Sequence, residues 1–210
     1  MTSKRNLFVY STLIILHSGC ASMSESECVT ADWEMIGMED GVKGNLPSNI
    51  GLYRSACADH GITPNLAAYR NGHSKGLVHF CTKPRGFTLG QRGTAYNGVC
   101  PTDLAESFID GYQAGRKLFN ARSEVNHEAS QIAIKKKQLK TLKDDICKGG
   151  ELLISENTSA IQRIQILDKI INNQKQIGGL EDEILDIEKR KKVKEKNYQE
   201  LKKRYDYSNL

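Results

Sequence analysis

"GMEDG" (residues 37–41), "GHSKG" (72–76) and "GYQAG" (111–115) repeat one spacing of two glycines, and each pair follows an aromatic residue. Glycine inside a helix costs about 1 kcal/mol relative to alanine, so three such pairs require a packing reason. Residues four apart lie on one helix face, where paired glycines let a second backbone approach closely. The spacing predicts three short helices packed backbone to backbone. A phosphate-binding loop is a weaker alternative, because no strand precedes these glycines and no Lys-Ser or Lys-Thr follows them.

Helix-start signals accompany the glycines. Thr30 and Ser48 are placed to cap helices, and Thr63 precedes Pro64 at a first helical position, where the missing N–H is not needed. No segment of comparable quality alternates between apolar and polar residues as a strand would. Residues 20–119 are therefore predicted to form a small helical head.

An export signal opens the chain. Lys4 and Arg5 precede "LFVYSTLIIL" (7–16), an apolar run of about ten residues. That length suits a secretory signal and is short of the roughly 20 residues that a membrane-spanning helix needs. We therefore predict a signal peptide over residues 1–19.

The end of this signal places a cysteine at position 20. "SGC" (18–20) resembles the lipobox of bacterial lipoproteins, although His17 stands where leucine is usual. The resemblance implies that Cys20 becomes the lipid-bearing first residue of the mature chain, and two or three acyl chains anchor a protein stably to a membrane. Ala21 after the cysteine favours the periplasmic face of the outer membrane. An ordinary signal peptide cleaved near Ala21, with Cys20 discarded, is the alternative.

Four further cysteines fall within the head: Cys28, Cys57, Cys81 and Cys100. An even number in an oxidising compartment predicts two disulfides. Three pairings are open, and we favour Cys28–Cys57 with Cys81–Cys100, since each closes one loop of about 20–30 residues. No two of these cysteines have the close spacing of a zinc knuckle, so the "HFC" stretch with His73 nearby is only a weak hint of a metal, and we predict no metal site.

Three motifs of the head occur together in a known family. They are the tryptophan, glycines and aspartate of "WEMIGMEDG" (33–41), "GITPNLAAYRNG" (61–72), and "AYNGVCP" (95–101), ahead of a charged coil. This pattern resembles domain of unknown function 2799, a family of bacterial, mostly proteobacterial, lipoproteins, over about residues 28–119. The resemblance implies an envelope lipoprotein without an assigned role. It supplies no catalytic residues and supports the pairing of the four cysteines.

The segment between Cys81 and Cys100, rich in glycine and carrying basic and aromatic side chains, is predicted to be a long irregular loop. Such loops are often functional, and cations beside aromatic rings suit a glycan, an anionic sugar or a lipid headgroup. The candidate ligand-binding residues are Arg85, Phe87, Arg92 and Tyr96. The simpler interpretation is a disulfide-closed loop that covers the glycine helices, and we favour it.

Catalytic and nucleic-acid-binding patterns are weak. Asp40 and Asp110 both precede glycines, which a helix position explains as well as acid–base chemistry does, and no nucleophile has a base and an orienting group beside it. The chain has 30 Lys and Arg against 25 Asp and Glu, and removing Lys4 and Arg5 leaves a net charge of only +3. We therefore predict no enzyme, no cofactor and no nucleic-acid partner.

Residues 120–210 carry the pattern of a long antiparallel coiled-coil hairpin. Apolar residues recur at steps of three, four and seven on both sides of Gly149–Gly150, where we expect the first helix to end, with Ser155 capping the second. If Gly178–Gly179 also ends a helix, a three-helix bundle results. The fold expected for the whole chain is all-α, a disulfide-locked head followed by this hairpin.

Three details of the hairpin follow from a turn near residue 151. The basic run at 189–196 is interpreted as a solvated face partly neutralised across the hairpin by acidic residues of 103–110, with contact to membrane or lipopolysaccharide as the alternative. Tyr198, Leu201 and Tyr205 are expected to pack on "NGVCP" (97–101). Cys147 is left over near the tip, facing outward, as a free thiol or an intermolecular disulfide.

Two classes of function agree with these features. The first is a membrane-anchored periplasmic lipoprotein whose coil binds a protein partner or a second copy of itself. The second is a module that binds an envelope ligand (glycan, peptidoglycan or anionic lipid) through the Cys81–Cys100 segment, with the coil as a spacer.

Overall fold

The computed structural model describes residues 23–205, so the predicted signal peptide and Cys20 lie outside the described residues. Within that range the chain forms helices and no strand, which confirms the all-α prediction. The chain divides into two compact units, one up to Phe80 and one from Cys81 onward, and each is described by itself. The boundary predicted after residue 119 falls instead inside a long uninterrupted helix.

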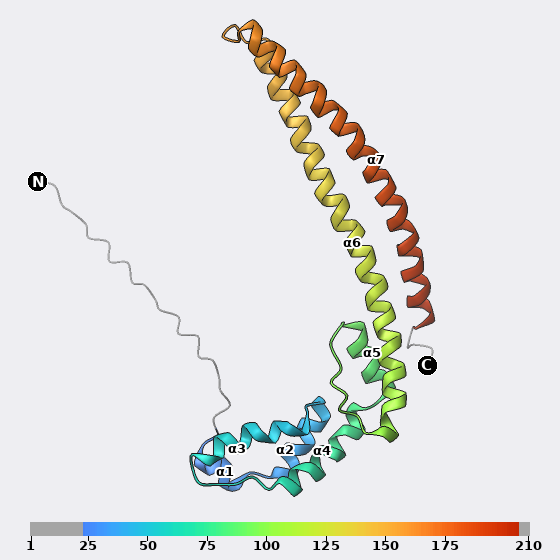
Figure 1. Ribbon diagram of the computed structural model, residues 1–210. Helices are drawn as coiled ribbons and strands as arrows, with labels where there is room; N and C mark the ends of the chain where they lie inside the picture. Colours follow the sequence, from blue (N-terminus) through green and yellow to red (C-terminus); the bar gives the residue numbers. More distant parts are fainter. Residues whose placement is uncertain (1–22, 206–210) are drawn as a thin grey trace, which may run out of the picture. The chain divides into compact units, whose positions relative to one another are not determined.

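From residue 23 onward, unit 1 contains α1 (Glu25–Thr30), α2 (Trp33–Lys43), α3 (Ile50–Ala58, after a 3-10 turn at Pro47–Asn49) and α4 (Leu66–Phe80) (Figure 1). Asp32, not Thr30, caps α2 by accepting from the N–H groups of Glu34 and Met35. Helix α4 begins two residues later than its proline suggested, because the Asn65 side chain accepts from the N–H of Ala68 and supplies the cap.

Unit 2 contains α5 (Lys83–Gln91), α6 (Thr102–Leu153) and α7 (Ala160–Arg204) (Figure 1). The prediction of an irregular loop between Cys81 and Cys100 was wrong for its first half, which forms α5. Thr82 caps this helix, and Pro84 lies in its first turn, where a proline N–H is not needed. The glycines that suggested turns are instead the contact surface of the helix.

The predicted close packing of glycine helices is present in unit 1, between α2 and α4. A Cβ added at Gly37 would collide with the Tyr69 carbonyl, and one at Gly72 with the Glu34 carbonyl. Gly41 and Gly76 face each other in the same way. The two backbones are therefore in direct contact, at a distance that any side chain at these positions would prevent.

Helices α5 and α6 repeat this arrangement in unit 2. Gly86 and Gly90 of α5 lie against the carbonyls of Phe108 and Tyr112, and Gly111 and Gly115 of α6 lie against those of Lys83 and Phe87. The glycine pair of α5 was not recognised from the sequence.

The ends of the two pairs also correspond. Gly44 after α2 and Gly93 after α5 both have positive φ, 75° and 76°, and each lies under a phenylalanine ring, that of Phe80 and that of Phe119. A left-handed conformation favours glycine, and a Cβ would also strike the ring. The α2–α4 pair of unit 1 and the α5–α6 pair, which forms the base of unit 2, are therefore two copies of one structural repeat.

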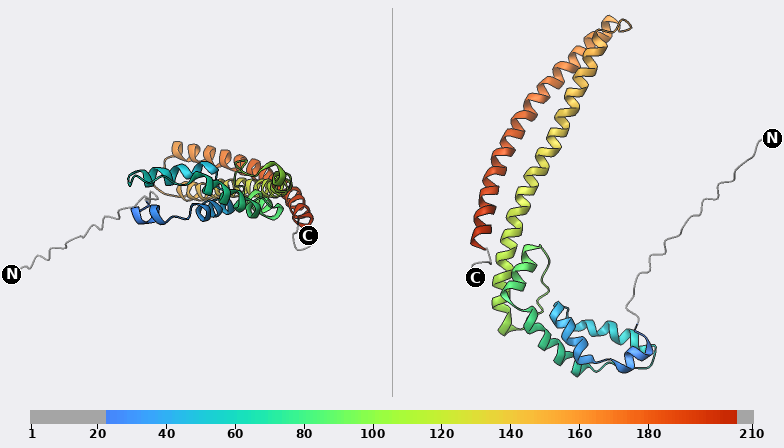
Figure 2. Two further views of the ribbon diagram at one scale, coloured as in Figure 1. Left: turned by 90° about the horizontal axis from the view of Figure 1, so that it is seen from below. Right: turned by 180° about the vertical axis from the view of Figure 1, so that it is seen from behind.

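Beyond this base, α6 and α7 form the predicted antiparallel hairpin (Figures 1 and 2). The break expected at Gly149–Gly150 and the cap at Ser155 were wrong, since α6 runs on to Leu153 and Ser159 caps α7. Arg163 closes the turn by donating to the carbonyls of Leu153, Ser155 and Thr158. Helix α7 also passes through Gly178–Gly179 without interruption, so the three-helix alternative is not formed.

The later turn changes the register along the hairpin. Ion pairs join Lys135 to Glu183, Lys136 to Glu188 and Lys143 to Glu181. The basic run therefore lies beside the middle of α6 and not beside residues 103–110, as predicted. Tyr205, at the end of α7, packs on the ring of Phe87 in α5, with centroids 6.3 Å apart, and so contacts the head at a different place from "NGVCP".

Candidate functional site

Both predicted disulfides form, Cys28–Cys57 in unit 1 and Cys81–Cys100 in unit 2. Each joins a cysteine ahead of the first glycine helix of a pair to a cysteine ahead of the second. The bond therefore closes the same side of both helix pairs. All four sulfurs belong to buried residues, so the bridges are part of the core and not exposed redox groups.

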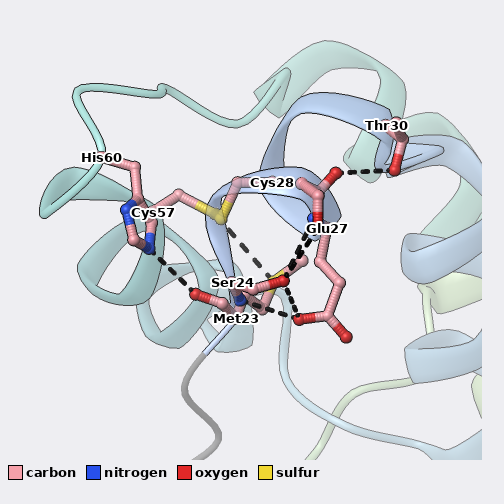
Figure 3. The surroundings of a disulfide bond; sticks show 8 residues. Met23, Ser24, Glu27, Cys28, Thr30, Cys57 and His60 are labelled. Carbon is pink, nitrogen blue, oxygen red and sulfur yellow. Dashed lines mark hydrogen bonds between the residues drawn. A yellow bond between two sulfur atoms is a disulfide. The ribbon is translucent and has the colours of Figure 1, made fainter.

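Figure 3 shows how α1 is held around Cys28. Ser24 and Glu27 form a reciprocal capping box at its start, and His60, just after α3, reaches the carbonyl of Met23 with Nε2 at 3.2 Å. These contacts attach the beginning of the described chain to the disulfide side of unit 1.

Asp40 is a buried acid of unit 1, only 3% exposed. Its carboxylate accepts hydrogen bonds from Tyr69 Oη at 2.7 Å and from Asn45 Nδ2 at 2.7 Å. Asn49 Nδ2 and Tyr53 Oη donate at 3.3 and 3.2 Å. Four donors from three segments thus converge on one carboxylate.

This convergence fixes the protonation of the cluster. Burial alone would raise the pKa of Asp40, but the hydrogen bonds from Tyr69, Asn45, Asn49 and Tyr53 outweigh it and hold the pKa below its ordinary value. Burial raises the pKa of Tyr69, and its bond to Asp40 raises it further. The donors enclose the carboxylate, so Asp40 is a structural anchor that joins α2 to α3 and α4.

The four candidate ligand residues of the Cys81–Cys100 segment are placed in two different environments. Arg85 and Arg92 are exposed, whereas Phe87 is buried. Tyr96 lies on the ring of Phe108, with centroids 4.6 Å apart, and its hydroxyl accepts from the N–H of Cys100. The two aromatic rings take part in the packing of unit 2, and the ligand role of the four residues stays a prediction.

Glu128 is a second buried acid, which sequence analysis did not identify. It lies on α6, 5% exposed, and receives Lys194 Nζ at 2.7 Å and an Arg190 guanidinium nitrogen at 3.4 Å from α7. The hydrogen bond from Lys194 lowers the pKa of Glu128, and the charges of Lys194 and Arg190 lower it further. The pairing fixes the hairpin register, as a polar group in a coiled-coil seam does, and buried Asn173 on α7 adds a second such point.

Cys147 is a free, exposed cysteine on α6, as predicted. Its part in an intermolecular disulfide stays a prediction. Large apolar residues are exposed along the hairpin as well, chiefly on α7 and around the turn. Their sequence signal is the seven-residue spacing of Ile164, Ile171 and, two steps on, Leu185, which is weaker than the apolar stripe that faces α6.

Residues 23–205 contain neither a metal-site cluster nor a membrane-spanning helix. No group of three or more His, Cys, Asp or Glu side chains in this range comes together as a metal site. None of its helices combines the length and the apolar character needed to cross a membrane.

Comparison with known proteins identifies one family. Residues 32–117 match the family described as protein of unknown function DUF2799. No curated protein and no solved structure is significantly similar to the chain. The matched range covers both glycine helix pairs and leaves out the hairpin beyond residue 117.

Proposed function

Through residues 32–117 this chain belongs to the DUF2799 family, and we propose that it acts as a lipid-anchored envelope protein that presents a helical arm to a protein partner. The anchor is Cys20, on the periplasmic face of the outer membrane. The proposal makes the chain a structural and interaction protein, without a catalytic step.

The hairpin is the observation that carries this proposal. Beyond its contact with α5, helix α6 runs alongside α7 from about residue 120 to Leu153. This part of α6 is about 50 Å long at 1.5 Å per residue. A spacer that only met water would be expected to expose polar residues on its outer side. The outer side of α7 instead exposes Ile164, Ile171 and Leu185. Large exposed apolar residues in contiguous patches mark interaction surfaces.

The anchor and address rest on sequence features and on the disulfides. Two buried disulfides agree with an oxidising compartment such as the periplasm. The apolar run before "SGC" supports export and acylation. Radiolabelled palmitate should enter the wild type and not Cys20→Ala, and equal labelling of the two would refute the anchor.

An arm deletion tests the interaction role. Replacing residues 140–181 by a short glycine-rich turn keeps the base of the hairpin, including the Glu128 pairs with Arg190 and Lys194. We expect crosslinked complexes formed in intact cells to disappear while both disulfides and membrane association remain. Arg85→Ala plus Arg92→Ala serves as the control and should leave those complexes unchanged. If the arginine variant lost the complexes and the arm deletion kept them, the interaction site would instead be the Cys81–Cys100 segment.

A further inference from the structure

The outer face of α7 carries a second heptad that the hairpin does not use. Ile164, Ile171, Gly178 and Leu185 follow one another at steps of seven. The three large side chains are 61%, 64% and 52% exposed. At 100° per residue they lie on the side of α7 away from the seam residues Ile177, Ile184 and Ile187, which are buried against α6. Helix α7 therefore has two apolar stripes, and α6 covers one.

A row of charges of alternating sign runs beside this stripe. Asp168, Lys175, Asp182 and Lys189 also follow one another at steps of seven, and all four are exposed. Within residues 23–205 the first three form no ion pair, and Lys189 pairs only with the exposed Asp186 of its own helix at 3.3 Å. By contrast, the acids on the flank of α7 that faces α6 pair across the hairpin.

This pattern is complementary to itself in the antiparallel direction. If two copies of α7 meet around a two-fold axis between Gly178 and Gly179, Asp168 lies opposite Lys189 of the other copy. Lys175 then lies opposite Asp182, and Ile164 opposite Val193, which is 71% exposed. All four charges meet an opposite charge at this register. If one copy were shifted along the other by seven residues, Asp168 would instead lie opposite Asp182, and like charges would meet.

The glycines at the axis fit the same geometry. A Cβ at Gly178 or at Gly179 would meet no atom within 4 Å, so neither glycine is required by packing within the hairpin. Two exposed glycines inside a 45-residue helix cost about 1 kcal/mol each relative to alanine. Opposite a second helix they let the two backbones approach closely, as the glycine pairs of the head do.

We infer that the outer face of α7 binds a second copy of this chain, antiparallel and two-fold symmetric about Gly178–Gly179. A two-fold interface uses the same patch on both subunits, and flanking charges select partner and direction in coiled coils. The two hairpins then form a four-helix assembly over about 44 Å of α7. The inference rests on the proposed function only in taking the arm as the part that interacts.

Disulfide trapping tests the axis in the full chain, in intact cell envelopes and on a Cys147→Ser background. Gly178→Cys should give a dimer on non-reducing electrophoresis after mild oxidation, because two cysteines at the axis come within disulfide reach. Gly150→Cys is the matched control, an α6 glycine with equally open surroundings, and should stay monomeric. Equal crosslinking of the two variants, or none from Gly178→Cys, would overturn the inference.

Charge reversal tests the direction. On the Gly178→Cys background, Asp182→Lys should lower the dimer fraction about fivefold, since it places like charges together at two symmetric positions. Adding Lys175→Asp should restore the dimer. Ile171→Glu should lower the dimer fraction at least about tenfold through lost apolar burial. Dimer unaffected by Ile171→Glu, or not restored by the second charge change, contradicts antiparallel pairing.

The two proposals fail in different ways. An arm that binds only another protein would lose its complexes on deletion of residues 140–181 and yet give no Gly178→Cys dimer. A chain without a lipid anchor would still give that dimer.

Discussion

The α2–α4 and α5–α6 pairs use the same glycine framework around different interiors. Both have glycines at the crossing, a left-handed glycine under a phenylalanine ring, and a disulfide closing the same side. Inside the first pair lies the Asp40 carboxylate with its four donors. At the matching place, one residue before the second glycine, the other pair has Leu89.

The aromatic residue ahead of the glycines in the second helix of each pair differs accordingly. The Tyr69 hydroxyl donates a hydrogen bond to Asp40. Phe108 has no hydroxyl and packs on the ring of Tyr96 instead. The difference shows that the glycine contacts set the crossing of the helices, whereas the interior accepts either a polar cluster or an aromatic one. The helix pair is therefore specified by the positions without side chains.

The largest expected effect comes from filling those positions. Gly72→Ala in unit 1 and Gly111→Ala in unit 2 each place a Cβ against backbone of the facing helix, which cannot move aside as a side chain can. We expect each to cost about 3 kcal/mol in the free energy of unfolding of its own unit. Hydrogen exchange followed by peptide separates the two units. Gly51→Ala, which meets open space, should be neutral or stabilise by up to about 1 kcal/mol, and equal losses at Gly51 and Gly72 would contradict the backbone contact.

Removing either disulfide should have an effect of similar size. Replacing Cys28 and Cys57 by serine, or Cys81 and Cys100, is expected to lower stability by about 3 kcal/mol in each unit. Because the sequence separations are 29 and 19 residues, the first pair should cost about 0.4 kcal/mol more in the chain-entropy model. Urea unfolding measures both, and a loss in the second unit on removing the first bridge would show that the repeats are not separate.

Asp40 should make the stability of the first pair sensitive to acid. Its pKa is lowered in the folded state, so its contribution is complete above the ordinary value of about 4 and is lost as the pH falls through the folded pKa. Fluorescence of Trp33, the only tryptophan and a buried residue of unit 1, reports the transition. Asp40→Asn should cost about 2 kcal/mol at neutral pH and flatten this pH dependence. An unchanged acid transition in that variant would assign the sensitivity to another group.

The smallest effect is expected at a matched pair of hydrogen bonds. His73 Nε2 donates to the carbonyl of Asn45 at 2.8 Å, and Tyr112 Oη donates to that of Thr94 at 3.0 Å, each bond closing the end of the first helix. Tyr112→Phe should cost about 1 kcal/mol or less. His73→Phe should cost more, because the Asn45 carbonyl then loses a donor from a buried side chain. Thermal unfolding compares the two variants, and a larger loss of stability from Tyr112→Phe than from His73→Phe would contradict this prediction.

The sequence carried the repeat, and only part of it was recognised. "GMEDGVKG" (37–44) and "GFTLGQRG" (86–93) share all three glycine positions, and "YRNGHSKGLVHF" (69–80) matches "FIDGYQAGRKLF" (108–119) in the same way. Local signals alone predict a loop at 86–93, because proline, glycine and basic residues favour turns. In the structure the contact with α6 outweighs those preferences.

Local signals also limited the prediction of the hairpin. Apolar spacing was enough to predict two antiparallel helices, but Gly149–Gly150 outweighed the weaker signals of "SENTS" (155–159). Gly149 is tolerated because Ile166 and Ile170 pack over it. The convergence on Asp40 and the ion pairs of Glu128 depend on side chains far apart in the sequence, and spacing alone does not bring such residues together.

Direct backbone contact has a consequence for how the head responds to temperature. The heat-capacity change on unfolding rises with the apolar surface exposed and falls with the polar surface exposed. At their glycine faces α2 and α4 bury peptide groups against one another, where two helices usually bury side chains. Unit 1 should therefore have a smaller heat-capacity change per residue than an ordinary helical bundle. The curve of its free energy of unfolding against temperature would then be broad and flat, so its stability would differ little between a cold and a warm environment.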